Sequence, residues 1–258
     1  AYLDATGDQA SLERHYPVLQ AIIRHYRSGT RFGIGMDPQD GLIRCADPGV
    51  QLTWMDASVA GRVVTPRSGK PVEINALWYN ALRSMADFAR RLVQSPAPFE
   101  TLADKVAEGF SRFRRGDDAG LYDVLDGPAG HDAAIRPNQI FAVSLTHSPL
   151  ASVTVRRAIV AECRAHLLTP FGLRSLSPQD PAYRGRYAGG VAEREGREDP
   201  AERPVPRRHL ALLPETDQGV LVPRIQHHRP FEGLARPGVF LAGQASVSQA
   251  KALPGASP

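Results

Sequence analysis

The chain has 258 residues, 42% of them hydrophobic, which is enough for one large domain with a substantial core. Its 31 basic and 27 acidic residues are spread along the sequence and give a formal net charge of +4, which argues against a nucleic-acid-binding arm. Cys45 and Cys163 lie far apart, so the sequence indicates neither a disulfide framework nor a zinc-type cysteine motif.

No apolar run approaches the length of a membrane span, and the first residues lack the basic start and apolar block of a signal peptide. We therefore expect a cytoplasmic protein with no membrane or nucleic-acid partner, no bound metal and no cofactor. The oligomeric state stays open. Because the chain has no initiator methionine and opens within what looks like a helical repeat, we also expect a fragment of a longer protein.

Residues 9–27 carry apolar side chains at helical spacing, with Asp8 placed to cap the segment and Gly29 to end it, and they predict a first long helix. A loop rich in glycine and aspartate follows. Its segment DPQDG alternates acids with turn residues, but the bidentate glutamate that a calcium loop needs at its twelfth position is missing. Asp37 and Asp40 are therefore explained as turn formers.

Trp54 and Asp56 lie two residues apart in the segment TWMDA, so an extended backbone would direct both side chains to the same side. An indole can cover the apolar face of a pyranose while a neighbouring acid protonates a glycosidic oxygen. The alternative is that Trp54 belongs to the core and Asp56 caps the next turn. The two residues alone favour this alternative.

A helix is predicted to begin after the turn segment TPRSG, where a proline and then an acid suit a first helical turn. Apolar residues recur at spacings of three and four over residues 74–92. Glu73 is explained as a helix-start acid, and Trp78 as core. The start of this helix would face whatever the TWMDA loop faces, and it is rich in polar side chains: Arg67, Lys70, Glu73 and Asn75.

Further apolar periods predict helices over residues 99–113 and 153–168, and turn residues around Leu121 indicate a short extended piece followed by a loop. Another helix begins near Arg136 and Asn138, where side chains and free backbone amides could both meet a ligand. Equally, Asn138 could cap the helix and Arg136 could pair with a surface acid, and the sequence leaves both interpretations open. Because the sequence contains no strand-rich region, it favours an all-helical (all-α) fold.

Several long motifs, in register, resemble one family. The segments QLTWMDA and VVTPRSGKPVEINALWYNAL resemble the glucosidase domain of glycogen debranching enzymes, the amylo-alpha-1,6-glucosidase family, in its bacterial and archaeal form. GTRFGIGMDPQDGLI precedes them in the family's order, and IRPNQIFAVSLTHSPL and TPFGLRSLSPQDPAYRGRYAGG follow. The resemblance extends over residues 1–193.

The resemblance implies a partial (α/α)6 toroid of the six-hairpin glycosidase type, whose loops at one end form a sugar pocket. Enzymes of this family remove the single glucose left at an α-1,6 branch point of glycogen-like or maltooligosaccharide substrates. They do so with inversion, using a carboxylic acid and a carboxylate base. Asp56 stands at the position of the acid, and Asp37 and Asp40 would be acceptors for sugar hydroxyls in the pocket wall. The substrate-binding residues would be Trp54, Arg67, Lys70, Glu73, Asn75, Arg136 and Asn138.

The end of the sequence departs from the family. Residues 191–258 hold nine of the 22 prolines but only two of the 18 aromatic residues. The tryptophan-rich helix and the glutamate base of the family are not found there, and Glu215 and Glu232 lack the surrounding motif. We expect a glucosidase domain over 1–195 and a frameshifted or disordered tail over 196–258, with a genuine extension as the alternative. Without the base the chain should be inactive; a catalytically dead carbohydrate-binding module is the alternative function.

Overall fold

A computed structural model describes residues 2–185, apart from residues 46, 48, 49, 51, 56, 60, 61, 117 and 118; of residues 59 and 62 it describes the backbone alone. Asp56 and the whole predicted tail, residues 196–258, lie outside the described residues. The catalytic role of Asp56 and the domain boundary near residue 195 therefore stay predictions.

About half of the described residues are helical. This part of the chain has six α-helices: α1 (Tyr2–Thr6), α2 (Gln9–Ser28), α3 (Val72–Arg91), α4 (Ala97–Phe110), α5 (Phe141–Ser144) and α6 (Val153–Leu167). Short 3₁₀ helices lie at Arg31–Gly33, Ser111–Phe113 and Pro137–Ile140. None of the helices described is long and apolar enough to cross a membrane.

The ends of the predicted helices follow the capping residues. The carboxylate of Asp8 accepts a hydrogen bond from the backbone N–H of Ser11 at 2.9 Å, and α2 ends at Gly29, where φ is 92°. At the start of α6 the hydroxyl of Ser152 accepts from the backbone N–H of Val155 at 3.3 Å. The predicted helices over residues 9–27 and 153–168 are thus confirmed to within one residue at each end.

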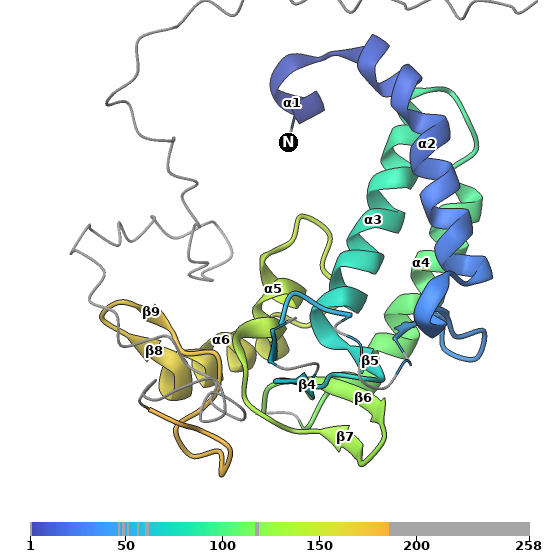
Figure 1. Ribbon diagram of the computed structural model, residues 1–258. Coiled ribbons are helices and arrows are strands. Elements are labelled where there is room, and N and C mark those ends of the chain that lie inside the picture. The colour runs from blue at the N-terminus through green and yellow to red at the C-terminus, as the bar shows by residue number, and fades with distance from the viewer. Residues whose placement is uncertain are drawn as a thin grey trace, which may run out of the picture. The chain divides into compact units, whose positions relative to one another are not determined.

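α3 packs against α2, α4 and α5 and carries much of the hydrophobic core (Figure 1). Its buried apolar side chains recur at the predicted spacing: Val72, Ala76, Trp78, Tyr79, Leu82, Met85, Ala86 and Ala89. Burying a side chain such as Leu82 contributes about 1.5–3 kcal/mol, so this face holds the helix in place. Trp78, predicted as core, is 5% exposed and donates its indole N–H to the backbone oxygen of Gly41 at 3.2 Å.

The described residues also contain nine short β-strands, so the expected all-helical class is not confirmed. The strands are β1 (Gly35–Met36), β2 (Ile43–Arg44), β3 (Ser58–Val59), β4 (Arg62–Val63), β5 (Lys70–Pro71), β6 (Val124–Gly127), β7 (Gly130–Asp132), β8 (Leu168–Thr169) and β9 (Gly172–Leu173). They pair antiparallel, β1 with β2, β3 with β4 and β8 with β9, while β5, β6 and β7 form a sheet in that order. Strands of two to four residues are too short to show an alternating pattern, so the sequence indicated only the short extended piece near Leu121, where β6 lies.

The three-stranded sheet lies at the N-terminal end of α3, because β5 runs directly into that helix (Figure 1). Lys70 of β5 stands opposite Leu125 of β6. Gly69, just before β5, has a φ of 128°, and a Cβ there would come within 2.5 Å of the backbone oxygen of Leu125. Glycine is therefore required for the close approach of the two segments. Two backbone hydrogen bonds of 2.7 Å join Gly69 to Cys45, which draws the loop after β2 to the same place.

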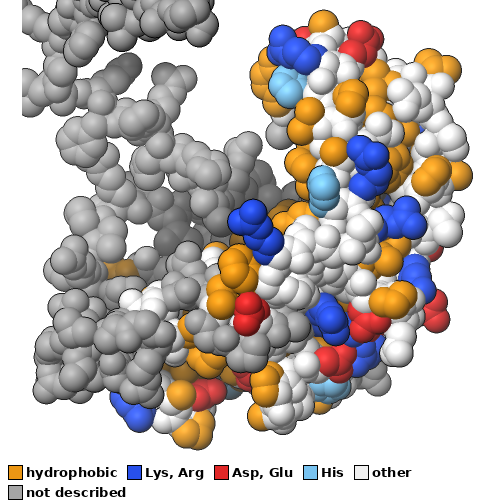
Figure 2. All heavy atoms as spheres, turned by 45° about the vertical axis from the view of Figure 1, so that its right-hand side comes forward, with side chains coloured by type: hydrophobic (Ala, Val, Ile, Leu, Met, Phe, Trp, Pro, Cys, Tyr) orange, Lys and Arg blue, Asp and Glu red, His pale blue; other side chains and the backbone are white. Residues whose placement is uncertain are grey.

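Charged side chains of both signs lie among exposed hydrophobic ones on the surface, as Figure 2 shows for the face turned forward. Exposed ion pairs include Arg90 with Asp87 at 2.7 Å and Arg91 with Asp4 at 2.6 Å. Such pairs contribute about 0–1 kcal/mol each, because water and salt screen them. The charged groups with larger consequences are therefore those that are buried.

Candidate functional site

Two clusters of charged and amide side chains form around the paired segments β5 and β6 and the loops next to them. The Arg67 cluster consists of Arg67, Glu73, Asp123, Arg136 and Asn138. The Lys70 cluster consists of Lys70, Asp37, Asp40, Arg112 and Asp126. The antiparallel pairing of β5 with β6 brings one cation and one acid of each cluster together: Arg67, before β5, meets Asp123, before β6, and Lys70 of β5 meets Asp126 of β6.

Arg67 is 6% exposed and binds two buried carboxylates at once. Its Nη2 donates to Oε2 of Glu73 at 2.7 Å, and its Nη1 donates to the other oxygen of the same carboxylate. The same guanidinium group binds Asp123: Nε of Arg67 donates to Oδ2 at 2.7 Å, and Nη2 donates to Oδ1 at 3.0 Å. Nε of Arg136 lies 3.5 Å from Oδ2 of Asp123. Two guanidinium groups thus balance two carboxylates, and such pairing is what allows charges to be buried.

The protonation states in this cluster follow from burial and from its charges. Burial opposes the charge on Arg67, but the hydrogen bond to Glu73 and the charge of Asp123 outweigh it and raise the pKa of the guanidinium. Burial raises the pKa of Asp123, against the opposing charges of Arg67 and Arg136. The hydrogen bonds from Arg67 and Asn138 reach both carboxyl oxygens of Asp123 and come from N–H donors. The geometry therefore fits the ionised form of Asp123, which accepts at both oxygens.

Asn138 connects the Arg67 cluster to Trp54. Its Nδ2 donates to Oδ1 of Asp123 at 2.8 Å, and its Oδ1 accepts from the indole Nε1 of Trp54 at 3.0 Å. The interpretation of Asn138 as a helix cap is therefore wrong, and Arg136 is buried, so it is not a surface residue. Trp54 is 55% exposed, so the alternative interpretation that placed it in the core is wrong. Its N–H is held while much of its ring stays open to solvent.

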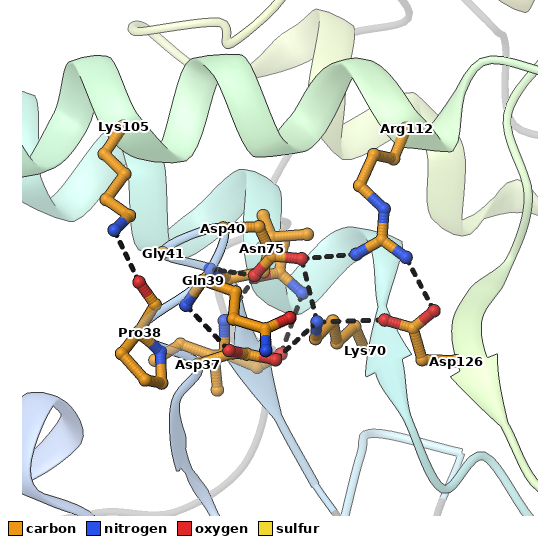
Figure 3. A network of polar contacts seen from close by, with 12 residues as sticks. Asp37, Pro38, Gln39, Asp40, Gly41, Lys70, Asn75, Lys105, Arg112 and Asp126 are labelled. Carbon is orange, nitrogen blue, oxygen red and sulfur yellow. Dashed lines mark hydrogen bonds and ion pairs between the residues drawn. The ribbon is translucent and has the colours of Figure 1, made fainter.

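The ammonium group of Lys70 is surrounded by three carboxylates, although the residue is only 4% exposed (Figure 3). Nζ lies 2.8 Å from Oδ2 of Asp37, 2.8 Å from Oδ2 of Asp40 and 2.9 Å from Oδ2 of Asp126. Arg112, just after α4, binds Asp40 and also lies 2.6 Å from Oδ1 of Asp126. Two cations, Lys70 and Arg112, therefore join the DPQDG loop to strand β6.

The aspartates of the DPQDG loop also form its turn. Oδ1 of Asp37 accepts from the backbone N–H of Gln39 at 2.9 Å, and Oδ1 of Asp40 accepts from that of Leu42 at 3.1 Å. The interpretation of both residues as turn formers is thereby confirmed. Their second oxygens bind Lys70, and this hydrogen bond lowers the pKa of Asp37.

Lys70 and Asp126 each keep one protonation state at neutral pH. Burial opposes the ionisation of Asp126, but hydrogen bonds from Arg112 and Lys70 outweigh it and lower its pKa to about 2. Burial also opposes the charge on Lys70, yet hydrogen bonds to Asp37, Asp40 and Asp126 raise its pKa. Lys70 therefore stays an ammonium and Asp126 a carboxylate at neutral pH, so the pair holds loops together and does not exchange protons.

Asn75 is fully buried in the first turn of α3 and serves the backbone of β2. Its Nδ2 donates to the backbone oxygens of Ile43 at 3.0 Å and Pro71 at 2.9 Å, and its Oδ1 accepts from the N–H of Ile43 at 2.7 Å. The side chain amide thus pairs with Ile43 as a neighbouring strand would, and it fixes β2 against the start of the helix.

Two hollows adjoin the clusters. A cavity of about 10 Å³, room for about one water molecule, is lined by Val50, Leu52, Thr53, Met55, Thr65, Arg67 and Ser68. A wider depression of about 270 Å³ is lined by Asp37, Arg44, Ser68, Gly69, Lys70, Asp126, Gly127 and Pro128. The first is too small for a sugar ring. The second lies against the Lys70 cluster, and the exposed Trp54 lies beside the Arg67 cluster.

The structure thus separates the predicted substrate-binding residues. It brings Trp54 together with four of them: Arg67, Glu73, Arg136 and Asn138. Lys70 joins the other cluster, and Asn75 bonds to backbone. Sequence reasoning missed the acidic members that come from the second segment, Asp123 and Asp126. An acid between the apolar residues of LYDVLDG was the available signal for Asp123, since a carboxylate in such a run needs a buried partner.

A helical core that gathers its polar side chains at the start of α3, beside an exposed tryptophan, is consistent with part of a helical domain of the glycosidase type. The sequence model of a family described as Amylo-alpha-1,6-glucosidase matches residues 1–198. The chain therefore belongs to the amylo-alpha-1,6-glucosidase family, and the resemblance seen in its motifs is confirmed. A comparison with curated proteins finds no match.

Proposed function

We propose that the chain carries the acid-bearing part of an α-1,6-glucosidase site that takes glycogen-like or maltooligosaccharide substrates. In this proposal Asp56 is the general acid, and the complete domain is an (α/α)6 toroid that releases α-1,6-linked glucose with inversion. Support comes from the family match over residues 1–198 and from one observation at the site. The ring of Trp54, two residues before Asp56, is 55% exposed while its N–H is held by Asn138.

The buried residues act, in this proposal, on the loops that present Trp54 and Asp56. Among the predicted substrate-binding residues, all of which the structure describes, Trp54 is exposed and the other six are at most 8% exposed. An exposed indole offers an apolar face to a pyranose ring. Four of the buried residues form the cluster that reaches this ring through Asn138, while Lys70 and Asn75 hold the DPQDG loop and β2.

We also propose that this chain does not turn over substrate. Inverting hydrolysis needs a carboxylate base as well as an acid, and Glu215 and Glu232 stand outside the family's motif for the base. Translation of the encoding DNA in the other two frames beyond residue 195 tests this. Recovery of a tryptophan-rich helix and a later glutamate supports a frameshifted hydrolase, and its absence contradicts one.

The acid is tested by glucose release from a branched dextrin. The present chain is expected to release none, whereas the protein in the restored frame should release glucose, and Asp56→Asn should lower that release by orders of magnitude. Release by the present chain that Asp56→Asn abolishes would contradict the missing-base argument. Unchanged release by the Asp56→Asn variant in the restored frame would refute the acid assignment.

A catalytically inactive carbohydrate-binding module is the second candidate, because the open ring of Trp54 needs no second carboxylate in order to bind a sugar. Calorimetry of the present chain with maltooligosaccharides separates the two. Saturable heat without glucose release supports the module, and the heat should be lost in Trp54→Ala. Phe171→Ala is the matched control, since that aromatic ring is also 55% exposed.

A further inference from the structure

We propose that Asp123 is a positioning residue that fixes the indole of Trp54 through the amide of Asn138. The hydrogen-bond relay runs from Asp123 Oδ1 to Asn138 Nδ2 at 2.8 Å and from Asn138 Oδ1 to Trp54 Nε1 at 3.0 Å. Asp123 and Asn138 are 2% and 1% exposed, whereas Trp54 is 55% exposed. A buried anion thus determines how an exposed aromatic side chain is held. The consequence for sugar binding rests on the proposed function.

The direction of the relay is set by the chemistry of the amide. A carboxylate only accepts hydrogen bonds, so Asp123 selects the orientation in which the NH₂ group of Asn138 faces it. The amide oxygen then faces the indole, whose N–H only donates. If the amide turned over, its oxygen would face the carboxylate and its NH₂ group the indole N–H. Both hydrogen bonds would then be lost together.

The first residue of the relay is itself immobilised. Arg67 contacts both oxygens of Asp123, at 2.7 and 3.0 Å, and Nε of Arg136 lies 3.5 Å from Oδ2. Charge-assisted bonds of this two-point kind restrict both the position and the rotation of a carboxylate. The sulfur of Met55 lies 3.6 Å from Nδ2 of Asn138, so the residue that follows Trp54 is in contact with the same amide.

Asp123→Asn tests the positioning role without changing side-chain size. Oδ2 of Asp123 faces Nε of two guanidinium groups, so the remaining amide oxygen of the variant is expected to stay at that side. The new NH₂ group at position 123 then stands where Oδ1 stood and faces the NH₂ group of Asn138. Since two donors cannot bond to each other, the amide of Asn138 must turn over, and its oxygen no longer accepts from Trp54. Glu162→Gln is the matched control, because it also turns a largely buried carboxylate, the partner of Arg115, into an amide, and it lies in neither of the two clusters.

Acrylamide quenching of tryptophan fluorescence in the full chain is the readout. The signal of Trp54 is obtained by subtracting the same variant carrying Trp54→Phe, which leaves the buried Trp78. We expect Asp123→Asn to raise the quenching constant of Trp54 up to about twofold, the limit set by its present 55% exposure, and Glu162→Gln to leave it unchanged. Equal effects in both variants, or no effect in either, would overturn the positioning role.

Asn138→Leu keeps the proposal testable if Asp123→Asn does not fold. This variant removes the relay while Asp123 keeps both arginines, so the quenching of Trp54 should rise as in Asp123→Asn. A fall in thermal stability with Trp54 unchanged would mean that Asn138 only supports the fold, and would overturn the proposal.

Binding of maltooligosaccharide to the same variants separates this inference from the proposed function. Where the wild-type chain gives saturable heat, Asp123→Asn and Asn138→Leu should weaken binding between about twofold and tenfold, as expected for one hydrogen bond. Glu162→Gln should not weaken it. Absence of heat in the wild-type chain contradicts the binding function, while the quenching experiment still decides the relay.

Discussion

Lys70→Met tests how much the Lys70 cluster contributes to the fold, because it preserves the length of a buried side chain and removes its charge. Three carboxylates then lose a cation that lies 2.8–2.9 Å from each of them. Asp40 and Asp126 keep their ion pairs with Arg112. Among the described contacts of the Asp37 carboxylate, the hydrogen bond from the backbone N–H of Gln39 remains, and it offsets only part of the negative charge.

The expected magnitude follows from these contacts. Removing one partner of a buried ion pair costs about 3–5 kcal/mol when the remaining charge is left in the interior. The side chains of Asp37 and Asp126 are 21% and 38% exposed, so water compensates part of that charge. We therefore expect a loss near the lower limit, about 3 kcal/mol in the free energy of unfolding, which is roughly a hundredfold in the folding equilibrium.

The loss should depend on pH in a definite direction. A carboxyl group whose pKa is lowered in the folded state stabilises the fold above its unfolded pKa of about 4 and loses this contribution as the pH falls. For Asp126 this occurs between about pH 4 and the folded pKa of about 2, and the pKa of Asp37 is lowered as well. Because Lys70 causes part of both shifts, the difference between wild type and variant should shrink as the pH falls below about 4.

Urea unfolding at neutral pH and near pH 3 measures both effects, with Lys105→Met as the control. Lys105 donates to the backbone oxygen of Pro38 in the same loop, so the control removes a lysine charge from the same region without disturbing the carboxylates. A loss below about 1 kcal/mol, as for an exposed pair, or one that is equal at both pH values, would refute the assignment of Lys70 as the central cation.

The other predictions concern packing, hydrogen bonding and thiol reactivity. Gly109→Ala should lower the free energy of unfolding by about 2 kcal/mol in urea, because a Cβ at this position would overlap the backbone oxygen of Asp40. Alanine has the better helix propensity, so an unchanged urea midpoint would contradict this reasoning. Asn75→Leu should cost about 3 kcal/mol, since three hydrogen bonds to buried backbone groups are lost, and a cost under about 1 kcal/mol would mean that the backbone finds other partners. Burial raises the pKa of Cys45 to about 11 and that of Cys163 to about 12, so a thiol reagent should modify neither in the native protein at about pH 8 and both after denaturation.

The helices could be predicted because their evidence is local and repeated. The apolar stripe of α6, Val155, Ile159, Cys163 and Leu167, is buried at all four positions. α3 repeats its pattern over 20 residues and begins where proline and an acid suit a first turn. Each turn of such a helix supplies independent support for the same assignment, so an error at one position does not alter the result.

The strands and the ion clusters could not be predicted in the same way, because their evidence is distant. Arg67 and Asp123 are 56 residues apart, and the contact exists only once β5 has paired with β6. The sequence identified Arg67 and Glu73 as a polar concentration, but nothing local to them names the acid on the other side. The buried run of Leu121, Asp123 and Leu125 carried a partial signal, since an ionised acid among buried neighbours requires a cation.

The Arg67 cluster raises the question of why charges are kept where apolar side chains could pack. Replacing buried ion pairs by hydrophobic residues is often neutral or stabilising by about 1–4 kcal/mol, so stability alone does not account for two arginines and two acids in this position. Apolar side chains could fill the same space, but they would offer Asn138 no acceptor and would leave the orientation of its amide undetermined. A carboxylate held at both oxygens by Arg67 specifies that orientation, and with it the acceptor that meets Trp54. The charges are therefore better explained by the direction they impose on one exposed ring than by the energy they add to the core.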